Sequence, residues 1–149
     1  MVSLNRISAL LIYLGSSAIG HFVWEVLQLP LYTIWAEPFR DKAFAVLHCT
    51  AGDLLIALCT LLAASFAAAN LAWPQGRFWR VAAITIVLGV GYTIFSEWLN
   101  VTVRASWTYS EWMPLVSAFG LQIGLSPLLQ WVVVPVAAFA LISRLAAGK

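Results

Sequence analysis

A histidine and a glutamate stand four residues apart, as His21 and Glu25, inside a long apolar stretch near the start of the chain. They are the only His, Asp, Glu, Lys or Arg residues between positions 7 and 31. Residues four apart share one face of an α-helix, so the two side chains can contact each other and one common partner. Burying a charge in hydrocarbon is costly, and ionisable residues kept in such a setting usually serve a function. The pair therefore indicates proton transfer in a water-poor site.

The third apolar stretch carries a polar stripe. Its members follow one another at spacings of four, three and four residues: Thr93, Glu97, Asn100 and Arg104. These spacings place the four side chains on one helix face. Set against the histidine and glutamate of the first stretch, this face predicts a cavity between helices that is lined by polar groups.

The second apolar stretch contributes His48 and Asp53. A separation of five residues corresponds to about 140° around a helix. We therefore expect that these two side chains do not both face the same centre. Cys49 follows His48 directly, and because adjacent residues diverge on a helix we interpret it as a buried, apolar cysteine.

Together these stretches offer two imidazoles and three carboxylates, which are the expected catalytic groups: His21, Glu25, His48, Asp53 and Glu97. Burial favours the neutral forms of such groups and so suits them to give and take protons near neutral pH. In an apolar cavity the weak base that accepts a proton can be an alkene. The resulting carbocation is stabilised by tryptophan faces and by nearby carboxylates.

Four elements must position these groups, and the composition identifies them as membrane helices. Of the 149 residues, 62% are hydrophobic and only 9% are charged, far from the roughly 25% charged residues of soluble domains. Four apolar stretches reach the roughly 20 residues that span a bilayer: about 7–31, 43–71, 80–101 and 124–146. They predict an all-α, polytopic four-helix bundle that forms a single transmembrane domain over residues 1–149.

Basic residues predict the orientation of this bundle. Five lie on the side of the two termini, Arg6, Arg77, Arg80, Arg144 and Lys149, and three on the other, Arg40, Lys42 and Arg104. Because cytoplasmic loops are enriched in basic residues, we expect both termini in the cytoplasm. The chain is then an integral protein of the cell inner membrane, or of the endoplasmic reticulum in a eukaryotic cell. The Asp, Glu and His residues of the spans all fall in the outer half of the bilayer.

Residues 105–123 precede the last span and are rich in aromatic side chains. Trp107, Tyr109 and Trp112 are of the types that gather at membrane surfaces. We expect an interfacial segment here, with a short helix from Leu115 that lies on or dips into the outer leaflet.

A metal site is one alternative interpretation of the same residues. Zinc accepts nitrogen and oxygen ligands, and His21, Glu25 and His48, with Asp53 or Glu97, could supply them. The chain has no His-Glu-x-x-His and no Cys-x-x-Cys motif, so the spacing is not diagnostic of such a site. Haem held between the two histidines is a further alternative. We expect no metal and no cofactor.

Three short motifs resemble those of the EXPERA family of four-helix membrane proteins, which contains the emopamil-binding-protein sterol isomerases and the sigma-2 receptor. They are His21-x-x-x-Glu25 in the first span, Gly91-Tyr92 followed by Glu97 in the third, and Trp131-Val-Val-Val-Pro135 in the fourth. Helix order, length and orientation are similar over nearly the whole chain. The resemblance implies that His21 and Glu25 form the proton-donating pair and that Trp131 is a wall that stabilises the cation.

The chain departs from this family in two of its spans. The second span offers His48 or Asp53 where the isomerases have Glu followed by Thr, and the fourth has Leu128 or Gln130 near where they have Asn. The first connection is also much shorter. These departures put a sterol substrate in doubt.

A weaker resemblance is to the small membrane lycopene cyclases, which also protonate an isoprenoid alkene. It rests on Glu97-Trp98-Leu99-Asn100 and on Trp107-x-Tyr109. The glycine-rich pattern that follows the acid in those enzymes is missing here.

We therefore predict a membrane-embedded isomerase or cyclase that uses acid/base chemistry on an isoprenoid or sterol-like lipid. In this hypothesis His21 and Glu25 carry the proton, Asp53 or His48 accepts or relays it, and Glu97 balances charge. The expected ligand contacts come from Trp24, Tyr92, Asn100, Arg104, Trp107, Gln130 and Trp131.

Two other classes of function stay open. One is a non-catalytic protein that binds sterols or hydrophobic amines, and the other is a metal- or haem-binding protein of transport, redox chemistry or assembly. The expected partners are the bilayer and a hydrophobic small molecule or lipid, with a second copy of the chain as a further candidate. A net charge of +2 without a basic run excludes nucleic acid.

Overall fold

The computed structural model describes residues 4–118 and 120–147. It is mostly helical, and four of its helices are long and apolar enough to cross a membrane. They are α1 (Arg6–Gln28), α2 (Phe39–Ala67), α3 (Phe78–Glu97) and α4 (Leu125–Ala147). The prediction of four apolar helices is confirmed. Lys149, one of the residues behind the predicted orientation, lies outside the described residues.

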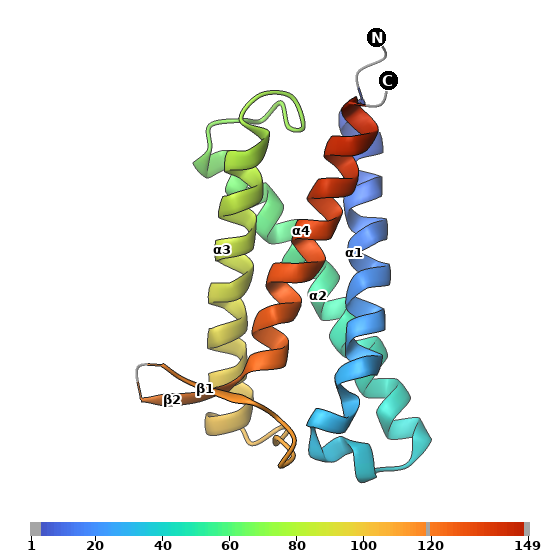
Figure 1. The fold of residues 1–149 in the computed structure, drawn as a ribbon, viewed down its shortest axis with the longest axis vertical. Helices are drawn as coiled ribbons and strands as arrows, with labels where there is room; N and C mark the ends of the chain where they lie inside the picture. Colours follow the sequence, from blue (N-terminus) through green and yellow to red (C-terminus); the bar gives the residue numbers. More distant parts are fainter. Residues whose placement is uncertain (1–3, 119, 148–149) are drawn as a thin grey trace.

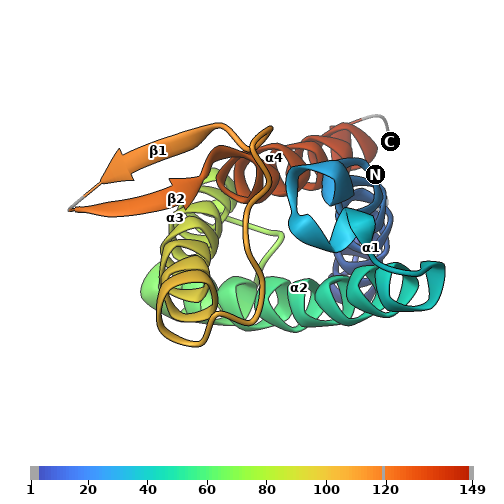
Figure 2. The ribbon, with the colours of Figure 1, turned by 90° about the horizontal axis from the view of Figure 1, so that it is seen from below.

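The four helices form one bundle, and its two ends differ (Figure 1). α1 and α3 stand apart, while α2 and α4 cross the space between them in opposite directions. Seen from below, α2 lies on one side of the α1 and α3 pair and α4 on the other (Figure 2). The start of α1, the end of α4 and the loop between α2 and α3 lie at one end, which we call the closed end, and the other connections lie at the opposite end.

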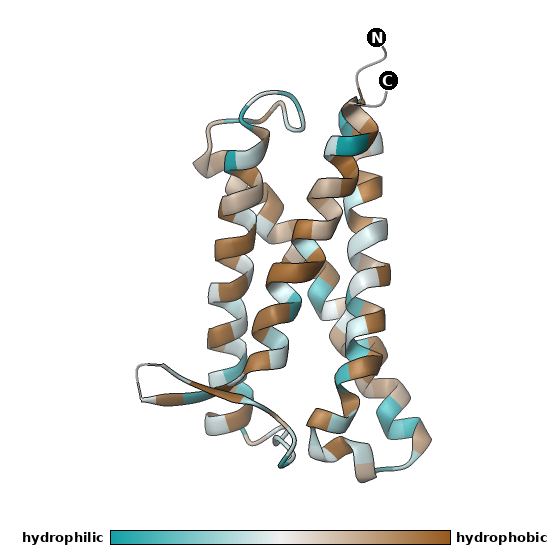
Figure 3. Ribbon diagram, viewed as in Figure 1, coloured by the Kyte–Doolittle hydropathy of each residue, from teal (hydrophilic) through white to brown (hydrophobic). Residues whose placement is uncertain are grey.

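Apolar residues follow the helices along their length, and hydrophilic residues gather in the loop between α2 and α3 and at the start of α2 (Figure 3). This distribution suits a protein whose helix surfaces face lipid. Apolar side chains such as Leu55, Phe66 and Val87 are exposed on the surface of the bundle. A membrane environment supplies the apolar partner that these side chains otherwise lack.

The helix bounds correct one prediction. α2 begins at Phe39 rather than near residue 43 and ends at Ala67 rather than near residue 71. It begins after Pro38, whose fixed φ suits the start of a helix, and its first turns contain three charged residues that an apolar stretch omits. It ends early because Ala69 adopts a left-handed conformation with φ of 48°, a common way to terminate a helix.

The two connections at the end opposite the closed end are also partly helical. After α1 the chain forms two short 3-10 helices, η1 (Leu29–Leu31) and η2 (Thr33–Ala36). After α3 it continues into a π-helical segment, η3 (Trp98–Val103), that ends where the backbone N–H of Arg104 donates to the carbonyl of Leu99 at 2.8 Å. The third span therefore extends to Val103.

The expected short helix from Leu115 is wrong. Residues Leu115–Ala118 form strand β1, which pairs antiparallel with β2 (Leu121–Gly124). The register sets Leu115 opposite Gly124 and Val116 opposite Ile123. Gly120 supplies the positive φ, 77°, that the turn requires. β-branched residues favour a strand over a helix here, so the bundle is not purely α-helical.

Candidate functional site

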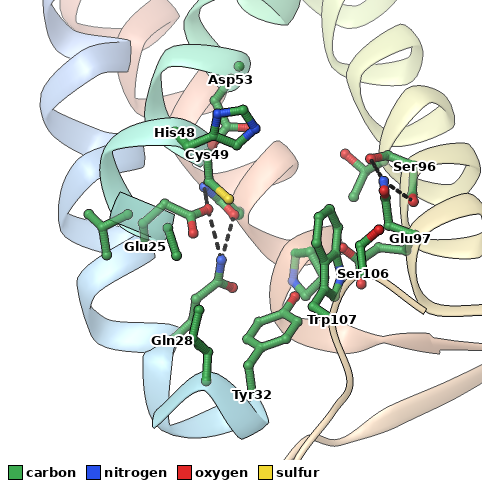
Figure 4. A pocket seen from close by; sticks show the side chains of 18 of the residues that line it. Glu25, Gln28, Tyr32, His48, Cys49, Asp53, Ser96, Glu97, Ser106 and Trp107 are labelled. Atoms are coloured by element: carbon green, nitrogen blue, oxygen red, sulfur yellow. Dashed lines mark hydrogen bonds between the residues drawn. The ribbon is translucent and has the colours of Figure 1, made fainter. Parts of the chain in front are cut away.

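A cavity of about 650 Å³ opens between the four helices, in the half of the bundle opposite the closed end; Figure 4 shows side chains that line it. Its walls come from the last turns of α1, the first half of α2, the last turns of α3 and the first turns of α4. Residues of the first and third connections, such as Tyr32 and Trp107, also line it. Its volume lies within the range of small-molecule sites.

The amide of Gln130, on α4, is the centre of a buried polar network on one wall. Its Nε2 atom lies 3.0 Å from Oε1 of Glu25, 3.1 Å from Oδ2 of Asp53 and 3.0 Å from Nδ1 of His21. Gln130 and His21 are almost fully buried, and the Asp53 side chain is 13% exposed. One amide group thus joins α4 to two acids and a histidine from α1 and α2.

The Gln130 amide faces more acceptors than it has hydrogens. The Gln130 amide nitrogen carries two hydrogens but faces two carboxylate oxygens and one ring nitrogen. A proton bound to Glu25, Asp53 or His21 gives the cluster a further donor. His21 Nδ1 lies 3.5 Å from Oδ2 of Asp53, which makes such a donation possible. The geometry suits a cluster that holds and passes a proton.

Gln28, one turn after Glu25 on α1, extends the network. Its Nε2 donates to Oε1 of Glu25 at 2.9 Å and lies 3.3 Å from Oε1 of Gln130. Its own Oε1 accepts from the hydroxyl of Ser126 at 2.8 Å, and that hydroxyl in turn accepts from Nε1 of Trp24 at 3.1 Å. These contacts fix the orientation of Glu25 from the α4 side.

A third acid lies across the cavity. Glu97, on the last turn of α3, faces the cavity from the wall opposite Glu25 (Figure 4). Its Oε2 accepts from the hydroxyl of Tyr109 at 2.5 Å, and that hydroxyl accepts from the backbone N–H of Gly124 at 2.9 Å. The chain therefore holds carboxylic acids on two walls of one cavity.

The first and third connections meet across the end of the cavity. Tyr32 and Tyr109 form an isolated β-bridge, and the backbone N–H of Thr33 donates to the carbonyl of Thr108 at 3.0 Å. Burial raises the pKa of Tyr109, and its hydrogen bond to Glu97 raises it further. Burial and the nearby charge of Glu97 also raise the pKa of Tyr32. Both phenols therefore stay protonated at neutral pH and remain hydrogen-bond donors.

Close helix contacts support the walls beside α4. A Cβ atom added to Gly20 on α1 would meet Cγ1 of Val134 at 2.7 Å, and one added to Gly89 on α3 would overlap the ring of Trp131. Trp131 also packs against the imidazole of His21, with ring centroids 4.9 Å apart. The two glycines therefore allow α4 to come close to both α1 and α3.

The structure places most of the predicted site residues at the cavity. Ten of them line it: Glu25, His48, Asp53, Tyr92, Glu97, Asn100, Arg104, Trp107, Gln130 and Trp131. His21 instead lies behind the wall, in contact with Gln130, and Trp24 bonds to Ser126 between α1 and α4.

His48 and Asp53 differ in burial and in their contacts, but they lie at the same cavity. Both line the cavity, although their spacing predicts that only one faces its centre. Asp53 joins the buried network, whereas His48 is exposed and stacks on Phe44 with ring centroids 5.5 Å apart. The two can share one cavity because it is wide enough to be lined by two faces of α2.

Sequence reasoning missed two contributors to the site, Tyr32 and Tyr109. Gln28 was expected from the sequence, because it continues the polar stripe of Ser17, His21 and Glu25 along α1, and it lines the cavity. Tyr32 and Tyr109 come from connections, and no local pattern predicts that they meet. Cys49, interpreted as buried and apolar, is half-buried and lines the cavity.

Within the described ranges, no group of three or more His, Cys, Asp or Glu side chains is arranged to hold a metal ion. Comparisons of the chain with protein-family models, with curated proteins and with solved structures found no match. The function must therefore be inferred from the chemistry of the cavity.

Proposed function

We propose that this chain is a membrane-embedded acid/base catalyst that isomerises or cyclises an alkene-containing lipid of the isoprenoid or sterol-like type. The observation that carries the proposal is the pair of acid sites on two walls of one cavity within the membrane spans. Glu25 and Asp53 share a donor on one wall, and Glu97 lies on the other. Two acid sites on separate walls can add a proton to one carbon of a substrate and remove one from another.

The proton balance of this reaction is simple. A neutral carboxylic acid, which we assign to Glu25, adds its proton to one carbon of the double bond and becomes a carboxylate. The neighbouring carbon becomes cationic, and the indole faces of Trp131 and Trp107 stabilise it. Glu97 then removes a proton from an adjacent carbon, and a new double bond forms. Return of one proton from Glu97 to Glu25 restores the site.

The cavity lining supports an apolar substrate. Apolar side chains such as Phe44, Ile56 and Leu29 stand among the polar groups, and the volume is about 650 Å³. A mostly apolar cavity with a few convergent polar groups is typical of small-molecule sites. Relationship to the EXPERA family is part of the proposal, supported by the positions of Glu25 and Trp131 at the cavity.

The orientation belongs to the proposal as well. We place both termini in the cytoplasm of a cell membrane or of the endoplasmic reticulum, on the basis of the basic residues near the termini. The acid sites then lie in the outer half of the bilayer. Accessibility of a tag fused to either terminus, measured in intact cells and after permeabilisation, tests this orientation.

The experiment that tests the chemistry uses heavy water. Purified protein is incubated in D₂O with a sterol that has a ring double bond, a linear polyprenol and a carotene, and deuterium incorporation is measured by mass spectrometry. We expect incorporation into one of these lipids, because each protonation adds solvent deuterium. Glu25→Gln should slow it by about 10²–10⁴-fold, the usual contribution of a general acid.

The matched control is Glu37→Gln, which changes an exposed glutamate outside the spans. It should incorporate deuterium at the original rate. Incorporation that persists in Glu25→Gln would remove this residue from its role. A folded protein that labels none of the three lipids would contradict the proposal for these substrate classes.

A second candidate function is supported by the charge of the cavity. Four of the described residues that line it are acidic: Glu25, Asp41, Asp53 and Glu97. Among the same residues, Arg104 is the single one with a basic Lys or Arg side chain. An acidic, apolar cavity suits a hydrophobic amine. In that case a long-chain tertiary amine should bind more tightly than the alcohol of the same chain, and Asp53→Asn should remove the difference. Equal binding of both ligands would contradict it.

A further inference from the structure

Three polar residues form a row on the inward face of α1. Tyr13, Ser17 and His21 follow one another at spacings of four residues, which places them above one another along the helix. They are 0%, 1% and 0% exposed. The row covers about 12 Å of helix axis at 1.5 Å per residue and leads from the polar network towards the closed end.

Each member of the row has a buried polar atom without a partner. Tyr13 OH, Ser17 Oγ and His21 Nε2 have no hydrogen-bond partner in the part of the chain that the structure describes. Buried polar atoms almost always bond to protein or to ordered water. Three such atoms on one face of one helix therefore indicate a place where water can bridge them.

Several other buried hydroxyls of the bundle behave differently, although Oγ1 of Thr50 on α2 also lacks a partner among the described residues. Thr60, Thr85 and Thr93 each donate to a carbonyl of their own helix, at 2.8, 2.9 and 2.9 Å. Ser16, next to Ser17, donates to the carbonyl of Ile12 at 2.7 Å. The hydrogen-bonding capacity of these hydroxyls is used within their own helix, as is common for structural hydroxyls in apolar helices. Ser17 does not, which distinguishes it from its neighbour.

We propose that Tyr13, Ser17 and His21, bridged by water, form a proton relay between the acid network and the closed end of the bundle. Hydroxyl and imidazole groups both donate and accept hydrogen bonds, and chains of such groups within membrane spans are used as proton relays. The relay extends the molecule's role from a local acid site to proton exchange with the membrane face at the closed end.

The lower end of the relay is His21, whose ring has a hydrogen-bond partner at Nδ1 but none at Nε2 among the described residues. Its Nδ1 faces Gln130 at 3.0 Å and Asp53 at 3.5 Å, and its Nε2 is the unpartnered atom. One ring nitrogen thus contacts the acid network, and the other is free to bond to the row. Such an imidazole connects two hydrogen-bonded chains.

The upper end of the relay is Tyr13, beneath the loop between α2 and α3. Its ring packs against Trp73 of that loop, with centroids 6.3 Å apart, and the loop lies at the closed end (Figure 1). Nε1 of Trp73 is also buried without a partner among the described residues. An indole N–H can hold a water molecule but cannot pass a proton on, so Tyr13 is the last relaying side chain.

Each transfer conserves protons and electrons. With the hydrogen on Nδ1, His21 accepts a proton at Nε2 from Ser17 or from water and becomes an imidazolium. Nδ1 then releases its hydrogen to the carboxylate of Asp53. One proton enters at Nε2 and one leaves from Nδ1, and proton exchange with bridging water, which takes the hydrogen from Nε2 and returns one to Nδ1, restores the first tautomer. Ser17 and Tyr13 regain protons from the water on their closed-end side.

Proton flux into vesicles tests the relay. The full chain is reconstituted in phosphatidylcholine and phosphatidylglycerol vesicles that contain a pH-sensitive dye, and a potassium gradient with valinomycin drives protons across the bilayer. We expect a flux above that of protein-free vesicles. Tyr13→Phe removes only the hydroxyl and Ser17→Ala only the Oγ, and each should lower the protein-dependent flux by about tenfold, because either gap interrupts the chain of donors and acceptors.

Ser16→Ala is the matched control, because it removes the neighbouring hydroxyl that is bonded to its own helix. It should leave the flux unchanged, and thermal unfolding should show that all variants are folded. A wild-type flux equal to that of protein-free vesicles would overturn the relay. So would a flux that neither Tyr13→Phe nor Ser17→Ala reduces. Deuterium incorporation into lipid is measured separately, so failure of the relay and failure of the proposed catalysis are distinguishable.

Discussion

The two ends of this bundle are built from the same four helices but are packed in opposite ways. At the closed end the rings of Tyr13, Trp73, Phe78 and Phe139 contact one another, with centroids of Tyr13 and Phe139 5.1 Å apart. At the other end the helices surround a cavity of about 650 Å³ whose walls carry acids and amides. One half of the bundle is therefore filled by packed side chains, and the other half encloses a cavity. We call them the packed half and the hollow half.

The difference indicates that the closed end stabilises the bundle and that the other end carries the functional site. Packed aromatic rings contribute contact area and specific ring geometry, so we assign most of the stability to the closed end. Buried polar groups cost free energy unless they are fully paired, and the Gln130 amide has two hydrogens for the three acceptors that it faces. A costly arrangement of this kind is what a functional site retains at the expense of stability.

The largest expected effect tests the packed half. Phe139 is almost fully buried among three aromatic rings, and Phe139→Ala leaves a hole there. It should lower the free energy of unfolding by about 3–5 kcal/mol, as such truncations do in protein cores. Denaturant-induced unfolding in detergent measures this change.

The control for that variant is Phe66→Ala, because Phe66 is exposed on α2. Truncation there creates no cavity and should leave stability unchanged. If both variants lose the same free energy, the closed end is not the source of stability and the comparison of the two ends fails.

A smaller effect is expected in the hollow half. Gln130→Leu keeps the approximate volume of the side chain but removes the donor shared by Glu25, Asp53 and His21. We expect a loss of about 1–3 kcal/mol, the usual cost of leaving buried polar groups unpaired, measured by the same unfolding experiment. Gln122→Leu, in the exposed part of β2, is the control and should have little effect. A stabilised Gln130→Leu protein would show that the network is not held together by this amide.

The smallest effect concerns the tyrosines at the cavity end and appears only at high pH. The pKa of Tyr109 is raised above its ordinary value of 10.0 by burial and by Glu97. Because the folded state holds this proton more tightly than the unfolded chain, the stabilisation is fully present below about pH 10 and is lost as the pH rises further. Unfolding curves between pH 8 and 11 measure the decline. In Tyr109→Phe the decline should be shallower, and an unchanged slope would contradict the assignment.

Much of the fold could be predicted from the sequence, because long apolar stretches dictate helices in a membrane. The bounds of α1, α3 and α4 lie close to the predicted ones, whereas the charged first turn of α2 escaped a criterion based on hydropathy. The hairpin of β1 and β2 was missed because four-residue strands leave little periodicity, and aromatic residues before it favoured an interfacial helix.

The candidate site could be predicted only in part. Spacing on one helix identified His21 with Glu25 and aligned Glu97 with Asn100, since i and i+4 neighbours are fixed by helix geometry. Which residue of α4 would meet them depends on how the helices cross, and that is a tertiary property. Gln130 was expected to touch a ligand, but the structure places its amide between the acids.

The position of Gln130 in the chain has a consequence for how the protein is made. α1 and α2 leave the ribosome first, and α4 follows last, because synthesis proceeds from the N-terminus. Until α4 arrives, Glu25 and Asp53 lack the donor that they share in the finished bundle. A chain stalled before Leu125 therefore holds Asp53 inside the bilayer without its amide donor and Glu25 with only the donor from Gln28. Insertion of the last helix completes the assembly and the acid site in one step.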